Sequence, residues 1–432
     1  MRTPLVDQTA ALLAHGYRWL PGLRRDAPAG VAHTRVLGQR AAVLCGPEAA
    51  RYFYDEDHVQ RRTAIPGPVL STLFGHGAVH TLDSVEHRRR KALFLSVLTP
   101  GGVADLAAHA CEAWDDAVAS WRPGRDVVLF DAASRVLTRA VCRWAGVPLD
   151  DAVARDVTAM VDGFATPGPR HWRARKARDR RERWLAGLIE EARSGVEPAS
   201  ARSALDEVAH HRDAGGGLLD SRVAAVELLN VLRPTVAVCW FVMFAGHALH
   251  RWPAHRERLA SGEPEFATAF AHELRRFYPF APFLGGRAVR DLEWRGEPIP
   301  AGSLVLLDVF GQHHDAGLWG DPYAFRPQRF VDRPVGAFDL IPQGGGDPAT
   351  RSSLPRRTRH DRTAGGAHRA LGADPLRRAR AEPDHLPPAR ARTGEEQVRH
   401  HPCDLTAAEA SRDRAVNGLR RGGVRRGRLR PA

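Results

Sequence analysis

The 82 residues from position 351 to the C-terminus contain no Phe, Tyr, Trp, Ile or Met, so that all aromatic residues of the chain precede them. Without large apolar side chains, a segment cannot offset the conformational entropy that it loses on ordering. This tail carries 20 Arg against 9 acidic residues, hence +11 of the net charge of +13, and leaves a nearly neutral body. We therefore expect residues 1–350 to form the folded domain and residues 351–432 to form a disordered, Arg-rich tail.

The chain also lacks cysteine pairs and long hydrophobic runs. Its five cysteines are scattered without the spacing of a metal site, and all except Cys403 lie in apolar surroundings typical of buried, reduced thiols. The N-terminal residues have no apolar run like that of a signal peptide. The longest apolar stretch, residues 236–245, is too short to span a membrane and suits a buried helix. These absences predict a cytoplasmic protein with no membrane partner.

Helical patterns dominate the first 350 residues. Apolar residues recur at helical spacing over 86–100, 203–213 and 265–279. Residues 221–252 are apolar nearly all round, as a helix through the middle of a large domain would be. Strand patterns are short and lie at 41–45, 126–130, 292–299 and 303–310. The sequence therefore predicts a mainly α domain with a small β portion.

Arg233 and Pro234 interrupt the apolar segment 221–252. Pro234 has no backbone N–H and crowds the carbonyl of Asn230, at a cost of about 3 kcal/mol in a regular helix. A buried guanidinium without an anionic partner is very unfavourable. Arg233 therefore needs either Glu227, two turns earlier, or the carboxylate of a ligand, and the sequence leaves both interpretations open.

Three further motifs follow in order: Glu273-x-x-Arg276, the segment 325–330 (FRPQRF) and the Gly-rich segment LIPQGGGD that begins at Leu340. An i,i+3 pair alone contributes only about 0.2–0.5 kcal/mol and is weak support for any function. The ordered set, together with Arg233-Pro234 and the segments 51–66, 71–83 and 86–100, resembles the cytochrome P450 superfamily. More narrowly, it is similar to the bacterial haem-thiolate peroxygenases that act on fatty acids.

The resemblance covers about residues 10–347 and implies a P450-like fold with a haem b cofactor. It also implies a fatty-acid substrate, hydrogen peroxide as oxidant and no need for an electron-donating partner protein. Arg233, beside Pro234, matches the arginine that holds the substrate carboxylate. His80 matches a position near the substrate where members with His tend towards decarboxylation to terminal alkenes, alongside hydroxylation at the alpha or beta carbon. Phe74 would pack beside it, while a core histidine remains the alternative for His80.

Further positions are implied to surround the haem. Those that match contacts to the haem propionates are Arg61, His87, Lys91 and, more weakly, Arg287. A solvated basic helix face is the alternative explanation for residues 87–91. Gly344 and Gly345 belong to the turn that passes close to the haem. The implied structural ion network behind the haem consists of Glu273, Arg276 and Arg329, with Gln328 where a Glu is common.

The cysteine that this resemblance requires is missing. The family continues the Gly-rich turn, here residues 344–346, with Gly-His-Arg-Cys-Pro-Gly, whose thiolate binds the iron. This chain has RSSLPRR at 351–357, with Leu354 in place of the cysteine. One permitted codon series for these residues (CGG TCA TCG TTG CCC CGG CGA), read without its first base, encodes Gly-His-Arg-Cys-Pro-Gly. We hypothesise a frameshift near residue 350, which accounts for the Arg-rich tail and predicts impaired haem binding, because Cys403 lies far down the tail.

Three other functions remain compatible with the sequence. The first is a haem-free remnant that binds fatty acids through Arg233. The second is a basic nucleic-acid-binding protein whose tail contacts phosphates. The third is a metal hydrolase built on His313, His314 and Asp315, a trio that also fits an ordinary loop.

Overall fold

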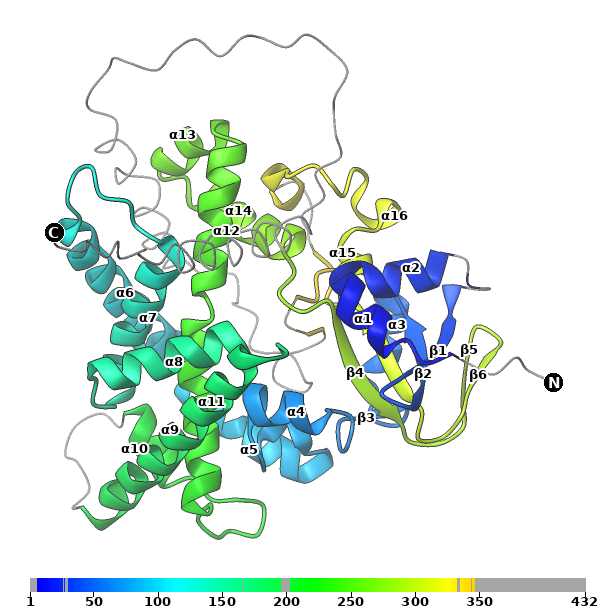
Figure 1. The fold of residues 1–432 in the computed structure, drawn as a ribbon, viewed down its shortest axis with the longest axis horizontal. Helices are drawn as coiled ribbons and strands as arrows, with labels where there is room; N and C mark the ends of the chain where they lie inside the picture. The colour runs from blue at the N-terminus through cyan, green and yellow to red at the C-terminus, as the bar shows by residue number, and fades with distance from the viewer. Residues whose placement is uncertain are drawn as a thin grey trace, which may run out of the picture.

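The computed structural model describes residues 6–25, 27, 30–164, 166–195, 203–331, 335–342 and 344–345. Predictions that concern Gly346, Leu354, Cys403 and the tail 351–432 lie outside these residues. Figure 1 shows a large group of helices beside a smaller part that combines the N-terminal helices with a β-sheet. The mainly α fold with a small β portion is confirmed.

The large helical part holds the helices of the middle of the chain. In order, these are α4 (Gly67–Val69), η3 (Leu70–Phe74), η4 (Val79–Thr81), α5 (Ser84–Val97), α6 (Pro100–Ser120), α7 (Leu129–Ala145), α8 (Asp151–Gly163), α9 (Pro169–Ser194), α10 (Ala204–Ala209), α11 (Ser221–Val236), α12 (Cys239–Arg251), α13 (Ala254–Ala260) and α14 (Pro264–Phe277).

The smaller part contains the strands and the remaining helices, except that the last of these, residues 327–330, packs against α14. The helices are α1 (Thr9–His15), η1 (Gly16–Arg18), α2 (Trp19–Arg25), α3 (Pro47–Phe53), α15 (Val309–His313), α16 (Ala316–Trp319) and η5 (Pro327–Phe330). The strands are β1 (Ala32–Val36), β2 (Gln39–Leu44), β3 (Val59–Gln60), β4 (Phe283–Ala288), β5 (Leu292–Trp294), β6 (Glu297–Ile299) and β7 (Leu304–Asp308).

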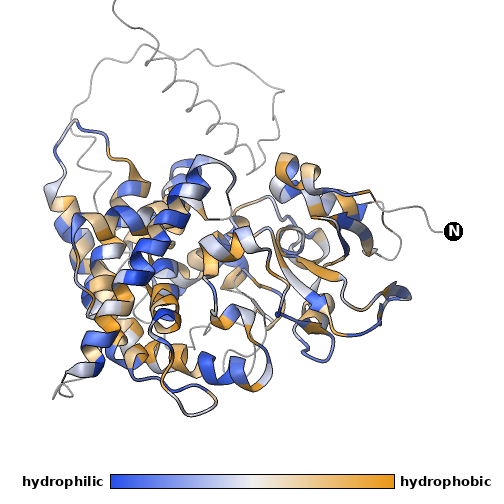
Figure 2. Ribbon diagram, turned by 60° about the horizontal axis from the view of Figure 1, so that its bottom comes forward, coloured by the Kyte–Doolittle hydropathy of each residue, from blue (hydrophilic) through white to orange (hydrophobic). Residues whose placement is uncertain are grey.

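Local sequence signals set the ends of several helices. Helix α6 begins at Pro100, and the side chain of Thr99 caps it by accepting from the Gly102 N–H. Helix α10 begins with a capping box between Ser203 and Asp206. Figure 2 shows the helices striped with hydrophilic and hydrophobic residues, the pattern of helices that bury one face.

The sheet joins segments that lie far apart in the sequence. Its strand order is β1-β2-β7-β4-β3, with β2 and β7 parallel and the other neighbours antiparallel. All five residues of β7 are buried, as expected for a strand in the middle of a sheet. The short edge strand β3 leads directly into residues 61–83, which cross from the sheet to α11 (Figure 1). This crossing segment carries several of the predicted site residues.

Helix α11 is the central element of the helical part. It contacts α7, α8, α9 and α10, and all but five of its 16 residues are buried. Taken together with α12 it is long and apolar enough to span a membrane, but 56% of that apolar window is buried inside the protein. This is the pattern of a core helix.

Two expectations about the elements are wrong. Residues 126–130 form no strand: they run as an irregular segment into α7, and Val127 and Val128 stay exposed without a neighbouring strand among the described residues. Residues 221–252 do not form one helix, because α11 ends at Val236 and α12 begins at Cys239. Pro234 has no N–H to donate to the Asn230 carbonyl, and this weakens the last turn of α11. The missing hydrogen bond explains why the helix is interrupted at residues 237–238.

Candidate active site

Arg233 lies on the last turns of α11 and is almost completely buried, with 4% of its surface exposed. Within the described parts of the chain its Nε has no hydrogen-bond partner, and no ion pair reaches the guanidinium. Burial, with a smaller contribution from Arg178, lowers the pKa of Arg233 to about 9. The ring of Phe164, at the end of α8, lies 5.9 Å from the guanidinium carbon. The site therefore contains a desolvated cation in apolar surroundings.

Glu227 is not the partner of Arg233, so the internal ion pair considered from the sequence is wrong. Its Oε1 accepts from Arg90 Nη1 and from the Val79 backbone N–H, both at 2.8 Å, and its Oε2 accepts from Asn230 Nδ2 at 3.3 Å. The Glu227 side chain is fully buried, and burial raises its pKa against the effect of these partners. Of the two interpretations of Arg233, the one that needs a ligand carboxylate remains.

The segment that carries Phe74 and His80 lies against this helix. Their rings are in contact, with centroids 4.0 Å apart and ring planes tilted by 31°. Burial, followed by the charge of Arg233, lowers the pKa of His80 to about 3, so its imidazole is neutral at physiological pH. His80 Nδ1 has no hydrogen-bond partner among the described residues. The structure thus brings together Phe74, His80 and Arg233, which are far apart in the sequence.

The backbone carbonyl of Phe74 is held by two side chains that the sequence analysis did not single out. Arg178 Nη2 on α9 donates to it at 2.7 Å, and Asn230 Nδ2 on α11 donates at 2.9 Å. Arg178 is itself paired with Glu182 at 2.6 Å. The following residue, Gly75, has φ +84°, and a Cβ there would lie 2.5 Å from Arg178. The available signal was Asn230, a polar residue one turn before Arg233 in an apolar helix.

Arg61 follows the edge strand β3, and its charge and that of Lys91 on α5 act on the His87 ring. Burial lowers the pKa of His87 to about 4, and the charges of Arg61 and Lys91 add to this effect. Arg61 also contacts Asp83 and Glu56 through Nη1 at 3.3 and 3.2 Å. Arg287 is engaged elsewhere, because its guanidinium donates to the carbonyls of Gly302 and Thr63 and to Gln39.

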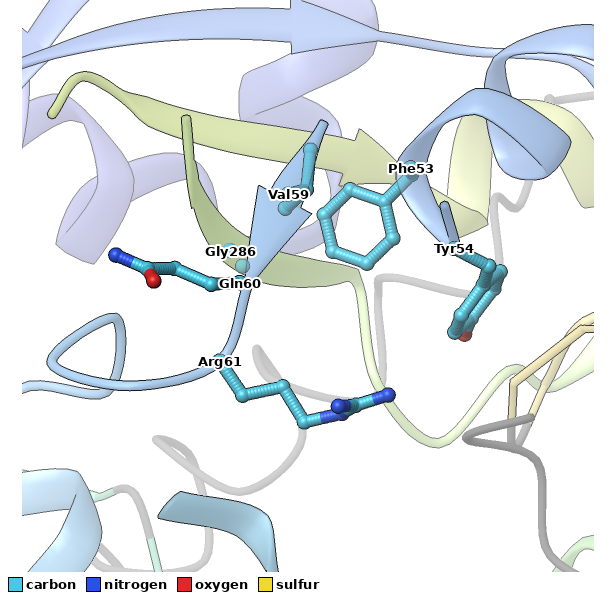
Figure 3. Close-up of a pocket in the computed structure, with 7 residues that line it drawn as sticks. Phe53, Tyr54, Val59, Gln60, Arg61 and Gly286 are labelled. Atoms are coloured by element: carbon cyan, nitrogen blue, oxygen red, sulfur yellow. The ribbon is translucent and has the colours of Figure 1, made fainter. Parts of the chain in front are cut away.

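Arg61 also lines a small cavity of about 30 Å³ next to β3 and β4. Figure 3 shows Tyr54 and Arg61 on the same side of β3. The backbone of Gly345 hydrogen-bonds the Tyr54 hydroxyl, whose pKa is raised by burial. A Cβ at Gly345 would lie 2.9 Å from Phe338 and 3.3 Å from Tyr54, so glycine allows the chain to pass closely here. Its neighbour Gly344 has φ +103°.

Glu273 and Arg276 on α14 form a buried, bidentate pair with both distances at 2.8 Å. Arg276 also donates to the carbonyls of His313 and Pro322 at 2.8 Å, and Arg329 contacts Glu273 at 3.1 Å. These bonds tie α14 to the segment 313–329. The same segment includes the candidates for a metal hydrolase, but no group of three His, Cys, Asp or Glu side chains suited to a metal occurs in the described residues. His313 instead accepts the Ile341 N–H through Nε2.

The residues present fit one half of a haem site and not the other. The cations Arg61 and Lys91, together with the neutral His87 ring as a hydrogen-bond donor, suit the haem carboxylates, and the closely packed Gly345 turn suits a backbone that runs beside a flat group. No described thiol is suited to the iron. The pKa values of Cys45 and Cys142 are raised to about 12 and that of Cys239 to about 11, in each case chiefly by burial, and Cys111 lies on α6. Since the thiolate is the form that binds metal, none of the thiols in the described residues is suited to serve as the iron ligand.

Comparisons with known proteins agree with this arrangement. Residues 263–347 match the family model "Cytochrome P450". A curated relative, cyclooctat-9-en-7-ol 5-monooxygenase of Streptomyces melanosporofaciens, is 23% identical over 386 residues, covering 79% of this chain and 82% of that protein. The cytochrome P450 monooxygenase okaD of Penicillium ochrochloron is 37% identical over 81 residues, so that this chain spans only 14% of its length.

Solved structures match over most of the chain. Cytochrome P450EX alpha (CYP152N1), solved with myristic acid, is 36% identical with a TM-score of 0.77. Cytochrome P450SP alpha (CYP152B1), solved with (R)-ibuprophen, is 38% identical with a TM-score of 0.79, and a variant of cytochrome P450 OleT, solved with arachidonic acid, is 36% identical with a TM-score of 0.78. Each match covers 86% of this chain and 90% of the other. The chain therefore belongs to the cytochrome P450 superfamily and, within it, to the fatty-acid peroxygenases represented by the CYP152 structures.

Proposed function

We propose that this haem-dependent oxidoreductase is built to oxidise long-chain fatty acids with hydrogen peroxide, by hydroxylation at the alpha or beta carbon or by decarboxylation. We also propose that the chain as written is impaired in this reaction. The observation that carries the first proposal is Arg233, a buried cation that has no acidic partner among the described residues. A fatty-acid carboxylate is the anion that suits such a site, because the guanidinium grips it through two parallel hydrogen bonds while the chain occupies apolar surroundings.

The roles of the site residues follow from their chemistry. Arg233 fixes the carboxylate, and this holds the alpha and beta carbons at a constant distance from it, whatever the length of the chain. Phe74 packs beside the headgroup, and the neutral His80 offers a ring nitrogen to the ligand. Arg61, His87 and Lys91 hold the haem carboxylates. Two of the related structures were solved with myristic and arachidonic acid, which supports the same substrate class here. We place the reaction in the cytoplasm, without a redox partner protein.

Impairment follows from the missing thiolate. Leu354 stands where the resemblance expects the cysteine, and RSSLPRR is compatible with a one-base shift from Gly-His-Arg-Cys-Pro-Gly. We propose that a frameshift near residue 350 separates this chain from an active reading of the same gene. Sequencing of the coding DNA tests this directly: an unbroken frame with no shifted Gly-His-Arg-Cys-Pro-Gly nearby contradicts it.

The proposed activity is tested by expressing the chain as written beside a version with the frame restored, and assaying both with myristic acid and peroxide. We expect hydroxylated or decarboxylated product from the restored version only. In that version Arg233→Ala should lower kcat/KM by at least about a hundredfold, since a desolvated bidentate ion pair contributes several kcal/mol. Undiminished turnover by the Arg233→Ala variant would refute the assignment.

The second candidate function is that of a haem-free protein that only binds fatty acids. It is favoured because the chain has Arg233 for a carboxylate but has Leu354 where the haem-ligating cysteine is expected. A Soret band and a carbon-monoxide difference spectrum on the purified chain separate the two. Myristate binding that is lost in Arg233→Ala, in protein without any haem absorbance, is the result that supports the binding function.

A further inference from the structure

Arg178 on α9 is a second buried arginine, with 2% of its surface exposed, and the protein occupies all of its side-chain nitrogens. Its Nε donates to Glu182 Oε1 at 2.6 Å, its Nη1 to the Leu73 carbonyl at 3.3 Å and its Nη2 to the Phe74 carbonyl at 2.7 Å. Arg233 differs, because its Nε has no hydrogen-bond partner among the described residues. The two buried arginines therefore have different tasks.

Arg178 lies close to the groups that are proposed to meet the ligand. Burial is the main cause of the lowered pKa of Arg233 and of that of His80, and the charge of Arg178 adds to both effects. A charge shifts the pKa of a neighbour only over a short distance, because solvent and protein screen it. Arg178 is thus near the headgroup site, although its own donors are taken.

The Phe74 carbonyl joins α9 to α11. It accepts from Arg178 and, at 2.9 Å, from Nδ2 of Asn230, which lies three residues before Arg233 on α11. The Phe74 ring in turn contacts the His80 ring, with centroids 4.0 Å apart. The hydrogen bonds to this one carbonyl therefore fix where the two rings lie relative to the helix that carries Arg233.

Gly75 shows how closely the backbone fits around Arg178. A Cβ at this position would lie 2.5 Å from Arg178 Nη2 and 2.9 Å from Glu182 Oε1, and the φ of +84° disfavours any other residue. A side chain here would displace either the guanidinium or the backbone that it holds. Gly75→Ala is therefore a way to disturb the same fit from the other side.

We propose that Arg178 is a positioning residue for the carboxylate site: it holds the Phe74 backbone so that the Phe74 and His80 rings lie beside the headgroup bound by Arg233. This inference rests on the proposed function, because it takes Arg233 as the carboxylate-binding residue. Arg178 does not touch the ligand, since its three nitrogens donate to protein acceptors. Side chains that contact a ligand keep their geometry when surrounding hydrogen bonds fix them, and Arg178 supplies these bonds.

Binding of myristate to the full 432-residue chain tests this role, measured by calorimetry with the folded fraction taken from circular dichroism. Arg178→Lys keeps the positive charge beside Glu182 but replaces three donor nitrogens by one, which cannot hold the acid and both carbonyls. We expect this variant to bind myristate at least about tenfold more weakly, because the Phe74 and His80 rings are no longer held beside the headgroup. Gly75→Ala retains Arg178 and should weaken binding to a similar extent.

Arg181→Met is the matched control for a purely structural effect. Arg181 lies on the same helix, pairs with Asp156 at 2.9 Å and has 14% of its side chain exposed. Loss of this pair should lower the unfolding temperature, while the folded protein binds myristate within about twofold of the parent. If Arg178 had only a structural role, Arg178→Lys would likewise lower the unfolding temperature and leave the affinity of the folded protein unchanged.

A double-mutant cycle with Phe74→Ala locates the effect. Because Arg178 acts through the position of the Phe74 ring, Arg178→Lys should weaken myristate binding by at most about threefold in the Phe74→Ala background. Two results would overturn the inference: parent-like affinity in Arg178→Lys, or the same loss in both backgrounds. If Arg178→Lys does not fold, as judged by circular dichroism and thermal unfolding, Gly75→Ala takes its place in the cycle.

The proposed function fails by a different result. A parent that does not bind myristate, or that still binds it after Arg233→Ala, contradicts the carboxylate site itself. Binding that is lost in Arg233→Ala and retained in both Arg178→Lys and Gly75→Ala contradicts only the positioning role of Arg178.

Discussion

Two histidines of the site are kept neutral by their surroundings, and this makes the stability of the protein sensitive to acid. The pKa of His80 is lowered to about 3 and that of His87 to about 4, chiefly because both rings are buried among cations. In the unfolded chain both regain ordinary values, so the unfolded state takes up protons first as the pH falls below about 6.5. Stability is therefore present above that pH and is lost as the pH falls towards 4.

We expect each of these histidines to contribute a slope of up to about 1.4 kcal/mol per pH unit below pH 6.5. Urea unfolding of the full chain between pH 7 and pH 5 measures the slope. His87→Gln should reduce it, whereas the same substitution at the exposed His76 should leave it unchanged. An equal slope in the parent and in the His87→Gln variant would show that the ring is accessible to protons in the folded state.

The sequence proposed Arg233 and His80 as site residues by motif, and in the structure His80 lies beside Phe74 and is affected by the charge of Arg233. The partner of Glu227 was not predictable, because Arg90 lies 137 positions away and nothing local indicates that their helices meet. The same holds for Arg178, whose hold on the Phe74 carbonyl depends on the packing of α9.

At the scale of elements, helix α14 is fixed to the loops after α15 by one arginine. Arg276 is fully buried, forms a bidentate pair with Glu273 and donates to the His313 and Pro322 carbonyls. Removal of one partner of a buried, hydrogen-bonded ion pair leaves the other charge uncompensated. Its loss should therefore cost more than the few tenths of a kcal/mol of an ordinary i,i+3 pair on a helix surface.

We expect Arg276→Met to lower the free energy of unfolding by about 3–5 kcal/mol, measured by denaturant or thermal unfolding. A matched control is Arg258→Met, which removes an exposed ion pair with Glu263 and should cost at most about 1 kcal/mol. Equal effects of the two substitutions would mean that the buried network adds no stability.

Helical spacing predicted α5, α10 and α14, and strand patterns predicted β2 and β7. The segment 292–299, expected as one strand pattern, forms the two paired strands β5 and β6. The strand expected at 126–130 failed because apolar, β-branched residues satisfy a strand pattern even where no partner strand is near. The single helix expected at 221–252 failed because its uniform apolar character conceals the break between α11 and α12. Pro234 marked the region of the break, but not its position three residues further on.

At the scale of the whole molecule, the positive charge lies mainly in the C-terminal tail, and the aromatic residues lie in the part before it. Residues 351–432 carry +11 of the net +13 and no aromatic residue, while the predicted site residues belong to the nearly neutral body. Non-specific binding of nucleic acid depends on the number of phosphates that basic residues neutralise, and it weakens steeply with salt. Any affinity for DNA should therefore belong to the tail and be independent of the DNA sequence.

We expect a chain that ends at residue 350 to lose salt-sensitive binding to duplex DNA, while it binds myristate within about twofold of the full chain, since Arg233 and its surroundings are retained. Fluorescence anisotropy with labelled DNA and calorimetry with myristate measure the two properties on the same preparations. DNA binding that survives the truncation, or that distinguishes between DNA sequences, would favour the nucleic-acid-binding function instead.

Haem retention tests the proposed impairment on the whole protein. Residues 1–350 supply Arg61 and Lys91 for the haem carboxylates and the closely packed turn at Gly345. Burial raises the pKa of the described thiols, such as that of Cys45, so these thiols stay protonated. A ligand that binds only the folded state stabilises it by mass action, so the frame-restored chain should retain haem through gel filtration and unfold at a higher temperature than the chain as written. Leu354→Cys alone is the informative control. It returns the sulfur without the neighbouring motif and the sequence that follows, so we expect it to retain far less haem than the restored chain. Equal haem retention by the chain as written and by the restored chain would contradict the proposed impairment and the role given in it to the thiolate.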